Sequence, residues 1–174
     1  KCTDYILNGL KRLEYRGYDS SGISSLEKPG EKFLIVKKEG KLENIEIELK
    51  KTPINGKIGI GHTRWATHGK PNTINAHPHR VGGTIFVHNG IIENYEILQK
   101  KITNLGRKTI SETDSELFGH LVEECLIQGL SFEESVRNAF LELEGSCSVV
   151  VVNDNYPQTL IAIRNGTPLV AGYS

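Results

Sequence analysis

The hydrophobic positions of this 174-residue chain first follow a helical spacing. Ile6, Leu7, Leu10 and Leu13 are separated by one, three and three residues, as on one face of a helix. We therefore expect an amphipathic helix from Thr3 to about Tyr15.

Most of the remaining apolar positions fall in short runs bounded by glycine, proline or polar residues, a pattern typical of strands. Such runs occupy residues 22–26, 33–37, 57–61 and 84–88, and again residues 146–153, 159–164 and 169–172 near the end of the chain.

Helical spacing returns between these strand-rich regions, first over residues 94–105. Two further helices are predicted to begin at capping boxes, Thr113 to Glu116 and Ser131 to Glu134. Because the helices cluster instead of alternating with each strand, we expect an α+β fold with largely antiparallel sheets, formed by one domain over residues 1–174.

The composition excludes several functional classes. Lys and Arg together number 21, as do Asp and Glu, so a net charge of zero gives no reason to expect nucleic acid as a partner. No apolar run approaches the roughly 18 residues of a membrane-spanning helix, so no membrane association is expected. The three cysteines, Cys2, Cys125 and Cys147, form no paired motif, which argues against a disulfide framework and favours a reducing, cytoplasmic compartment.

Three polar positions next to predicted strands or helices are candidates for binding a free amino acid. Arg64 follows a strand and can clamp a carboxylate, although a structural ion pair is an alternative. Asn89-Gly90 follows another strand and can donate to an oxyanion, although the same pair is a common hairpin turn. Asp114 lies at a predicted helix start, where it can bind an ammonium or simply favour the helix dipole.

Histidines are concentrated in the middle of the chain, which raises the possibility of a metal site. The spacing does not match a metal-binding helix, and no cysteine lies nearby, so neither a metal nor another cofactor is expected. His68 remains a candidate for hydrogen bonding to a ligand, beside a polar loop over residues 69–78. The clustered histidines are His62, His68, His77, His79 and His88.

Five motifs in order resemble the glutaminase domains of class II glutamine amidotransferases, specifically those of the glutamine–fructose-6-phosphate aminotransferases that make glucosamine 6-phosphate. The resemblance covers nearly the whole chain. The motifs are Glu14-Tyr-Arg-Gly-Tyr-Asp-Ser-Ser-Gly22, His62-Thr-Arg-Trp-Ala-Thr-His-Gly69, Asn75-Ala-His-Pro-His79, His88-Asn-Gly-Ile-Ile-Glu-Asn94 and Ser111-Glu-Thr-Asp-Ser-Glu116.

The resemblance implies a four-layer αββα sandwich of the N-terminal-nucleophile hydrolase type. It also implies a reaction in which an N-terminal cysteine attacks the side-chain amide of L-glutamine. Ammonia is then released to a following sugar-phosphate isomerase domain, which binds fructose 6-phosphate. The resemblance further implies that the full-length enzyme is a homodimer.

Carried over by position, the family motifs imply a role for each candidate residue. Arg64 would hold the substrate carboxylate and Asp114 its ammonium, while Asn89 and Gly90 would form the oxyanion hole. The remaining assignments are Thr67 and His68 in the substrate pocket, Trp65 as a gating residue and Arg16 near the nucleophile.

The chain departs from the family pattern at its start. The expected first strand and nucleophilic cysteine do not match any segment here, and Cys2 lacks the family's surrounding sequence, so we expect both upstream of Lys1. The isomerase domain is expected downstream of this chain. A non-catalytic glutamine-binding module is the main alternative, and a metal-dependent hydrolase is a third.

Overall fold

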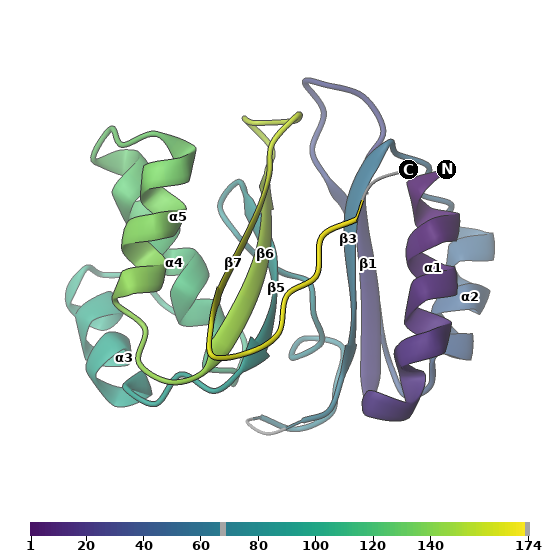
Figure 1. Ribbon diagram of the computed structural model, residues 1–174, viewed down its shortest axis with the longest axis horizontal. Helices are drawn as coiled ribbons and strands as arrows, with labels where there is room; N and C mark the ends of the chain where they lie inside the picture. Colours follow the sequence, from purple (N-terminus) through teal and green to yellow (C-terminus); the bar gives the residue numbers. More distant parts are fainter. Residues whose placement is uncertain (67–68, 173–174) are drawn as a thin grey trace.

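The computed structural model describes residues 1–66 and 69–172 as two antiparallel sheets with helices beside each (Figure 1). The first sheet has the order β2 (Leu34–Glu39), β1 (Ser20–Leu26) and β3 (Ile58–Arg64). The second has the order β4 (His79–Val81), β5 (Thr84–Gly90), β6 (Cys147–Asn153) and β7 (Leu160–Asn165). All pairings are antiparallel, which confirms the predicted α+β class.

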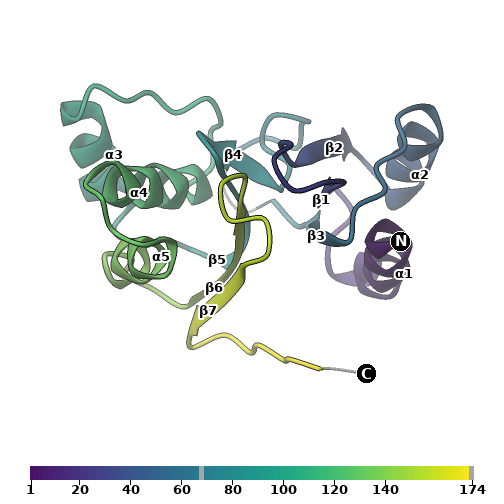
Figure 2. The ribbon, with the colours of Figure 1, turned by 90° about the horizontal axis from the view of Figure 1, so that it is seen from above.

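Each sheet carries helices on the face that points away from the other sheet (Figures 1 and 2). On the first sheet these are α1 (Cys2–Leu13) and α2 (Leu42–Lys51), with the short helix η1 (Glu14–Arg16) after α1. On the second sheet α4 (Ser115–Ile127) and α5 (Phe132–Leu141) pack on the strands, and α3 (Tyr95–Asn104) packs on α4. In the part of the chain that is described, no helix combines the length and apolarity needed to span a membrane.

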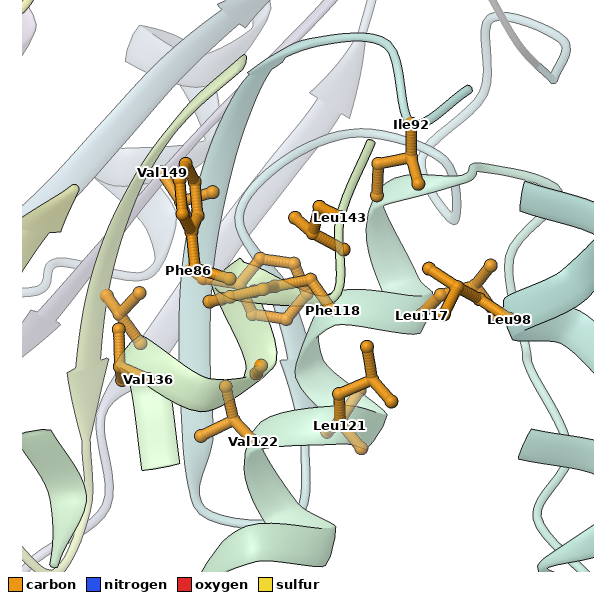
Figure 3. Packing of buried hydrophobic residues seen from close by; sticks show 14 of the residues in the cluster. Phe86, Ile92, Leu98, Leu117, Phe118, Leu121, Val122, Val136, Leu143 and Val149 are labelled. Carbon is orange, nitrogen blue, oxygen red and sulfur yellow. The ribbon is translucent and has the colours of Figure 1, made fainter. Parts of the chain in front are cut away.

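The largest buried cluster lies between the second sheet and its helices (Figure 3). The rings of Phe86 on β5 and Phe118 on α4 meet edge to face with centroids 5.4 Å apart. Full burial of such side chains contributes about 1.5–3 kcal/mol each. Because this cluster anchors β5 and α4 together, it fixes the ends of both elements, where three of the predicted site residues, Asn89, Gly90 and Asp114, lie.

Strand alternation on β6 separates two apolar clusters. Val149 and Val151 face the helices, whereas Val152 joins a second cluster between the two sheets, with Ile60 from β3 and Ile85 from β5. Successive side chains point to opposite faces of a strand, so one valine-rich run serves both clusters. The two sheets are therefore held face to face by side chains of β3, β5 and β6.

Most predicted elements form, with three differences. Neither α2 nor β4 was predicted, and residues 169–172, predicted as a strand, form none. The sequence of α2 alternates apolar and polar residues at Ile45, Ile47 and Leu49, as a strand would. In the helix, however, Ile45 is fully buried while Ile47 is 46% exposed, so packing against the first sheet overrides the local alternation.

One of the two predicted capping boxes is wrong. Ser131 and Glu134 form the expected reciprocal bonds at the start of α5. At α4 the N-cap is Asp114, with no side-chain capping bond. Glu116 instead accepts from the backbone N–H groups of Ile110, at 2.8 Å, and Ser111, at 2.6 Å. The Asp114 carboxylate therefore does not cap the helix and instead accepts a hydrogen bond from the backbone N–H of Ile92.

Candidate active site

The candidate site lies where β3 and β5 end, on the sides of the two sheets that face each other. Alternation along β3 puts Ile60, His62 and Arg64 on the same face, where all three are buried. Ile60 contributes to the cluster between the sheets. His62 Nε2 lies 2.8 Å from Asn89 Oδ1 on β5, so the ends of the two strands are joined directly.

Arg64, the last residue of β3, is 5% exposed. Its Nη2 donates to the carbonyl oxygen of Gly69 at 3.3 Å. Burial lowers the pKa of the Arg64 guanidinium, and the negative charges of Asp19 and Asp114 oppose that shift. An arginine stays protonated at neutral pH, so Arg64 provides a buried positive charge near two carboxylates.

Asp114 is also buried, at 4% exposed. Its Oδ2 accepts from the backbone N–H of Ile92 at 2.8 Å. Because Ile92 follows β5 by two residues, the carboxylate lies at the end of that strand. The electrostatic coupling of Asp114 to Arg64 puts a negative and a positive group in one site.

Asn89 and Gly90 are the last residues of β5 and are paired with Ser148 and Cys147 of β6. The pairing excludes the alternative of a two-residue hairpin at this position. Gly90 has a φ of +134°, and a Cβ there would lie 2.3 Å from the carbonyl oxygen of Ser146. Glycine is therefore required by the backbone, and both residues are exposed at the strand end.

Asp19 is a site residue that sequence reasoning missed. Its carboxylate accepts hydrogen bonds from the backbone N–H of Ala66 and, at 2.9 Å, from Ser20 Oγ. Its own N–H donates to the carbonyl oxygen of Arg64 at 3.3 Å. Asp19 thus holds the chain on either side of Trp65. The signal was present, because Asp19 lies within the first of the five motifs.

Trp65 and Arg16 are at the surface beside these groups. Trp65 is 62% exposed, and its ring lies 5.7 Å from that of Tyr18 in an edge-on arrangement. Arg16 is exposed at the end of η1, and the next residue, Gly17, packs on the backbone of Arg64. The other two predicted site residues, Thr67 and His68, lie outside the described residues.

Four of the clustered histidines, His62, His77, His79 and His88, are described by the structure and are buried, and the rings of three of them lie against one another. The ring centroids of His62 and His77 are 4.5 Å apart, and those of His77 and His79 are 4.4 Å apart. Burial lowers the pKa of His62 to about 4 and that of His79 to about 3, so these imidazoles are neutral at pH 7. Over residues 1–66 and 69–172, no group of three or more His, Cys, Asp or Glu side chains is arranged to hold a metal ion.

The cysteines of the chain do not supply a reactive thiol at this site. Cys147 lies opposite Gly90, but its side chain belongs to the cluster beneath the helices. Cys2 lies at the start of α1, and Cys125 lies in α4. Burial raises the pKa of all three thiols, which disfavours the nucleophilic thiolate.

The predicted loop over residues 69–78 is tied to its neighbours by polar contacts. The side-chain amide of Asn75 donates to Glu112 Oε2 at 3.0 Å, and Asn75 Oδ1 accepts from the Glu112 N–H at 2.9 Å. Lys37 on β2 donates to the carbonyl oxygens of Ile74 and Ala76. A cavity of about 480 Å³ lies under this loop and includes Lys37, but its lining does not include the strand-end residues.

The charges and donors at the two strand ends match a zwitterionic amino acid that carries a carbonyl group. A buried guanidinium can pair with a carboxylate, a buried carboxylate can pair with an ammonium, and an exposed amide N–H can donate to a developing oxyanion. Of the eight predicted site residues, the structure brings Arg64, Asn89, Gly90 and Asp114 together.

Comparison with known proteins identifies the family of this chain. A family model described as a glutamine amidotransferase domain matches residues 69–174. The glutamine–fructose-6-phosphate aminotransferase of Bartonella quintana is 47% identical over 99% of this chain, and that of Escherichia coli K12 is 43% identical over 97%. The chain spans only 28% of the length of each.

A solved structure supports the fold. The glutamine phosphoribosylpyrophosphate amidotransferase from B. subtilis superposes with a TM-score of 0.74 at 24% identity, covering 85% of this chain and 32% of its own. The family match covers more than half of the sequence and includes Asn89, Gly90 and Asp114, and the relatives confirm the resemblance carried by the five motifs. The chain therefore belongs to the glutamine amidotransferase domain family.

Proposed function

We propose that this domain hydrolyses the side-chain amide of L-glutamine to glutamate and ammonia. The observation that carries the proposal is the electrostatic interaction of a buried Arg64 with a buried Asp114, whose carboxylate is held beside the Asn89-Gly90 strand end. The two charges are complementary to the α-carboxylate and α-ammonium of a free amino acid. The strand end then lies where the substrate's side-chain amide would be polarised.

Each predicted site residue has a role in this proposal. Arg64 binds the α-carboxylate and Asp114 the α-ammonium, while the Asn89 amide and the Gly90 N–H stabilise the oxyanion. Trp65, exposed next to Arg64, closes over the site and gates ammonia release, and Arg16 lies near the nucleophile. Thr67 and His68 line the substrate pocket in this proposal.

The nucleophile is proposed to be a cysteine upstream of Lys1, at the start of a strand that pairs with the open edge of β3. Among the described strands β3 lies at a sheet edge. A strand antiparallel to β3 would begin beside Arg64 and finish beside Ile58, close to the point where the Cys2 N–H donates to the Gly56 carbonyl oxygen at 3.1 Å. Such a strand connects directly to α1 and completes a four-layer αββα sandwich.

The chemistry then follows acyl transfer. The thiolate attacks the amide carbon, and its negative charge passes to the carbonyl oxygen held by Asn89 and Gly90. The cysteine α-amino group, with an ordinary pKa of about 8, carries the proton from the thiol to the leaving nitrogen. Ammonia departs, and water hydrolyses the thioester to glutamate.

In the whole protein, the ammonia is proposed to reach fructose 6-phosphate bound by a downstream sugar-phosphate isomerase domain, giving glucosamine 6-phosphate in a cytoplasmic homodimer. The names of the two relatives support this step, because both are isomerising glutamine–fructose-6-phosphate aminotransferases.

The test is the intact mass of the full-length protein after exposure to an electrophilic glutamine analogue, with the modified peptide mapped. We expect one adduct, on a cysteine upstream of Lys1, and protection by L-glutamine. A Cys147→Ala variant is the matched control, because Cys147 is the thiol opposite Gly90. It should keep the adduct. Binding of glutamine without an adduct or hydrolysis would instead favour the glutamine-binding module.

A further inference from the structure

His62 links the two sheets at the candidate site through a single hydrogen bond. It is 7% exposed on β3, and its Nε2 lies 2.8 Å from Asn89 Oδ1 on β5. Asn89 itself is exposed, and an exposed amide turns freely unless something holds one end. His62 is the buried group that holds it.

The direction of this bond decides which end of the Asn89 amide faces the site. An amide oxygen only accepts, so His62 must carry its proton on Nε2. The amide NH₂ is then available for a substrate oxygen. With the proton on Nδ1, Nε2 would accept from the NH₂ group, and the amide oxygen would turn toward the substrate, where it would repel an oxyanion.

The surroundings of His62 favour the neutral form with the proton on Nε2. Its Nδ1 is buried without a hydrogen-bond partner among the described residues, so a proton on that atom would be unsatisfied. The ring of His77 lies against that of His62, with centroids 4.5 Å apart. Gly22, opposite His62 on β1, leaves room for this packing, because a Cβ there would lie 2.2 Å from the His77 carbonyl oxygen.

We propose that His62 is a positioning residue: its Nε2–H fixes the Asn89 amide with the NH₂ group directed at the oxygen of the substrate amide. This inference rests on the proposed glutamine hydrolysis and adds a residue that does not touch the substrate. A preoriented donor avoids reorganisation as charge develops, which is why such donors act mainly on turnover.

The kinetic test uses the full-length enzyme with the variants His62→Leu and His62→Gln. Leucine removes the donor but keeps an apolar side chain of similar size, whereas the glutamine amide can donate in place of Nε2. We expect His62→Leu to lower kcat for glutamine hydrolysis by about 10- to 100-fold, less than loss of the oxyanion donor itself, with KM changed by less than about 3-fold. His62→Gln should recover most of the turnover with the same pH profile.

A double-mutant cycle with Asn89→Ala separates positioning from independent effects. If His62 acts through Asn89, the double variant His62→Leu/Asn89→Ala should be no slower than Asn89→Ala alone. Multiplying losses would overturn the proposal, as would equal loss in the leucine and glutamine variants.

Nitrogen chemical shifts of His62 in the substrate-free wild-type protein provide a readout that does not depend on activity. We expect a neutral ring with the proton on Nε2, assigned by comparison with His62→Gln. A proton on Nδ1 would overturn the assignment even in an active enzyme. An inactive wild type with the Nε2–H bond intact would count against the proposed hydrolysis and not against the bond.

Discussion

Ile92 donates its backbone N–H to the Asp114 carboxylate over 2.8 Å, so the start of α4 is fixed to the segment that follows β5. One carboxylate thereby has two functions. It holds the loop after the Asn89-Gly90 strand end, and it supplies the negative charge next to Arg64. A substitution at Asp114 has to distinguish these functions.

Asp114→Asn should weaken glutamine binding while leaving the fold intact. The asparagine keeps an oxygen to accept from Ile92 but loses the charge that pairs with the substrate ammonium. A hydrogen bond between charged groups contributes about 1.5–3 kcal/mol, so we expect at least a 10-fold loss of affinity by calorimetry, with little change in Tm. Asp114→Ala should lose the affinity and also lower Tm. Unchanged affinity in both variants would show that another group binds the ammonium.

Asn89→Ala should lower turnover far more than it changes the apparent affinity for glutamine. Oxyanion donors act in the transition state, and removal of one typically costs about 100- to 1,000-fold in kcat. Steady-state hydrolysis of glutamine by the full-length enzyme measures both constants. Parallel losses in kcat and affinity would make Asn89 a binding or structural residue.

Local sequence patterns predicted the elements of this fold better than their exact ends. Helical spacing located α1, and the Ser131–Glu134 motif located the start of α5, because these signals depend on neighbours within one or two turns. Helix α2 was missed because Ile45, Ile47 and Leu49 alternate like a strand, and only packing against the first sheet selects the helix.

The sequence could name the individual candidate residues, but it could not predict the contacts between them. Arg64, Asn89, Gly90 and Asp114 were identified from residue type and motif. The bond from His62 to Asn89 joins two sheets and depends on register, which no local pattern specifies. The role of Asp19 was missed for the same reason, because the Ala66 N–H that it accepts from lies 47 residues away in the sequence.

Gly90→Ala should destabilise the domain through its backbone. The substitution puts a Cβ 2.3 Å from the Ser146 carbonyl oxygen at a φ of +134°. We expect a loss of more than about 3 kcal/mol in the free energy of unfolding, measured by urea denaturation. Gly129→Ala is the matched control. It has a φ of +89° with nothing within 4 Å of a Cβ, so only the strain of about 1–2 kcal/mol applies. Equal losses would mean that the strand end moves to accept the methyl group.

Stability should fall as the solution becomes acidic, before the carboxylates titrate. The pKa of His62 is lowered to about 4 and that of His79 to about 3, whereas an unfolded histidine titrates near 6.5. Below pH 6.5 the unfolded chain therefore binds protons that the folded protein excludes. The contribution of each histidine to the free energy of unfolding is complete above pH 6.5. It is lost as the pH falls toward 4 for His62 and toward 3 for His79, at about 1.4 kcal/mol per pH unit for each excluded proton.

Urea denaturation at pH 8, 7, 6 and 5 measures this slope above the range of Glu116, whose pKa is lowered to about 2. His79→Gln is the informative variant, because its amide can replace the bond between His79 Nε2 and Thr113 Oγ1, 3.1 Å long, without titrating. In this variant we expect the pH dependence of the free energy of unfolding between pH 6 and 5 to decrease by an amount that corresponds to close to one bound proton. An unchanged slope would mean that His79 takes up its proton in the folded protein, which its burial beside Phe86 and Thr113 argues against.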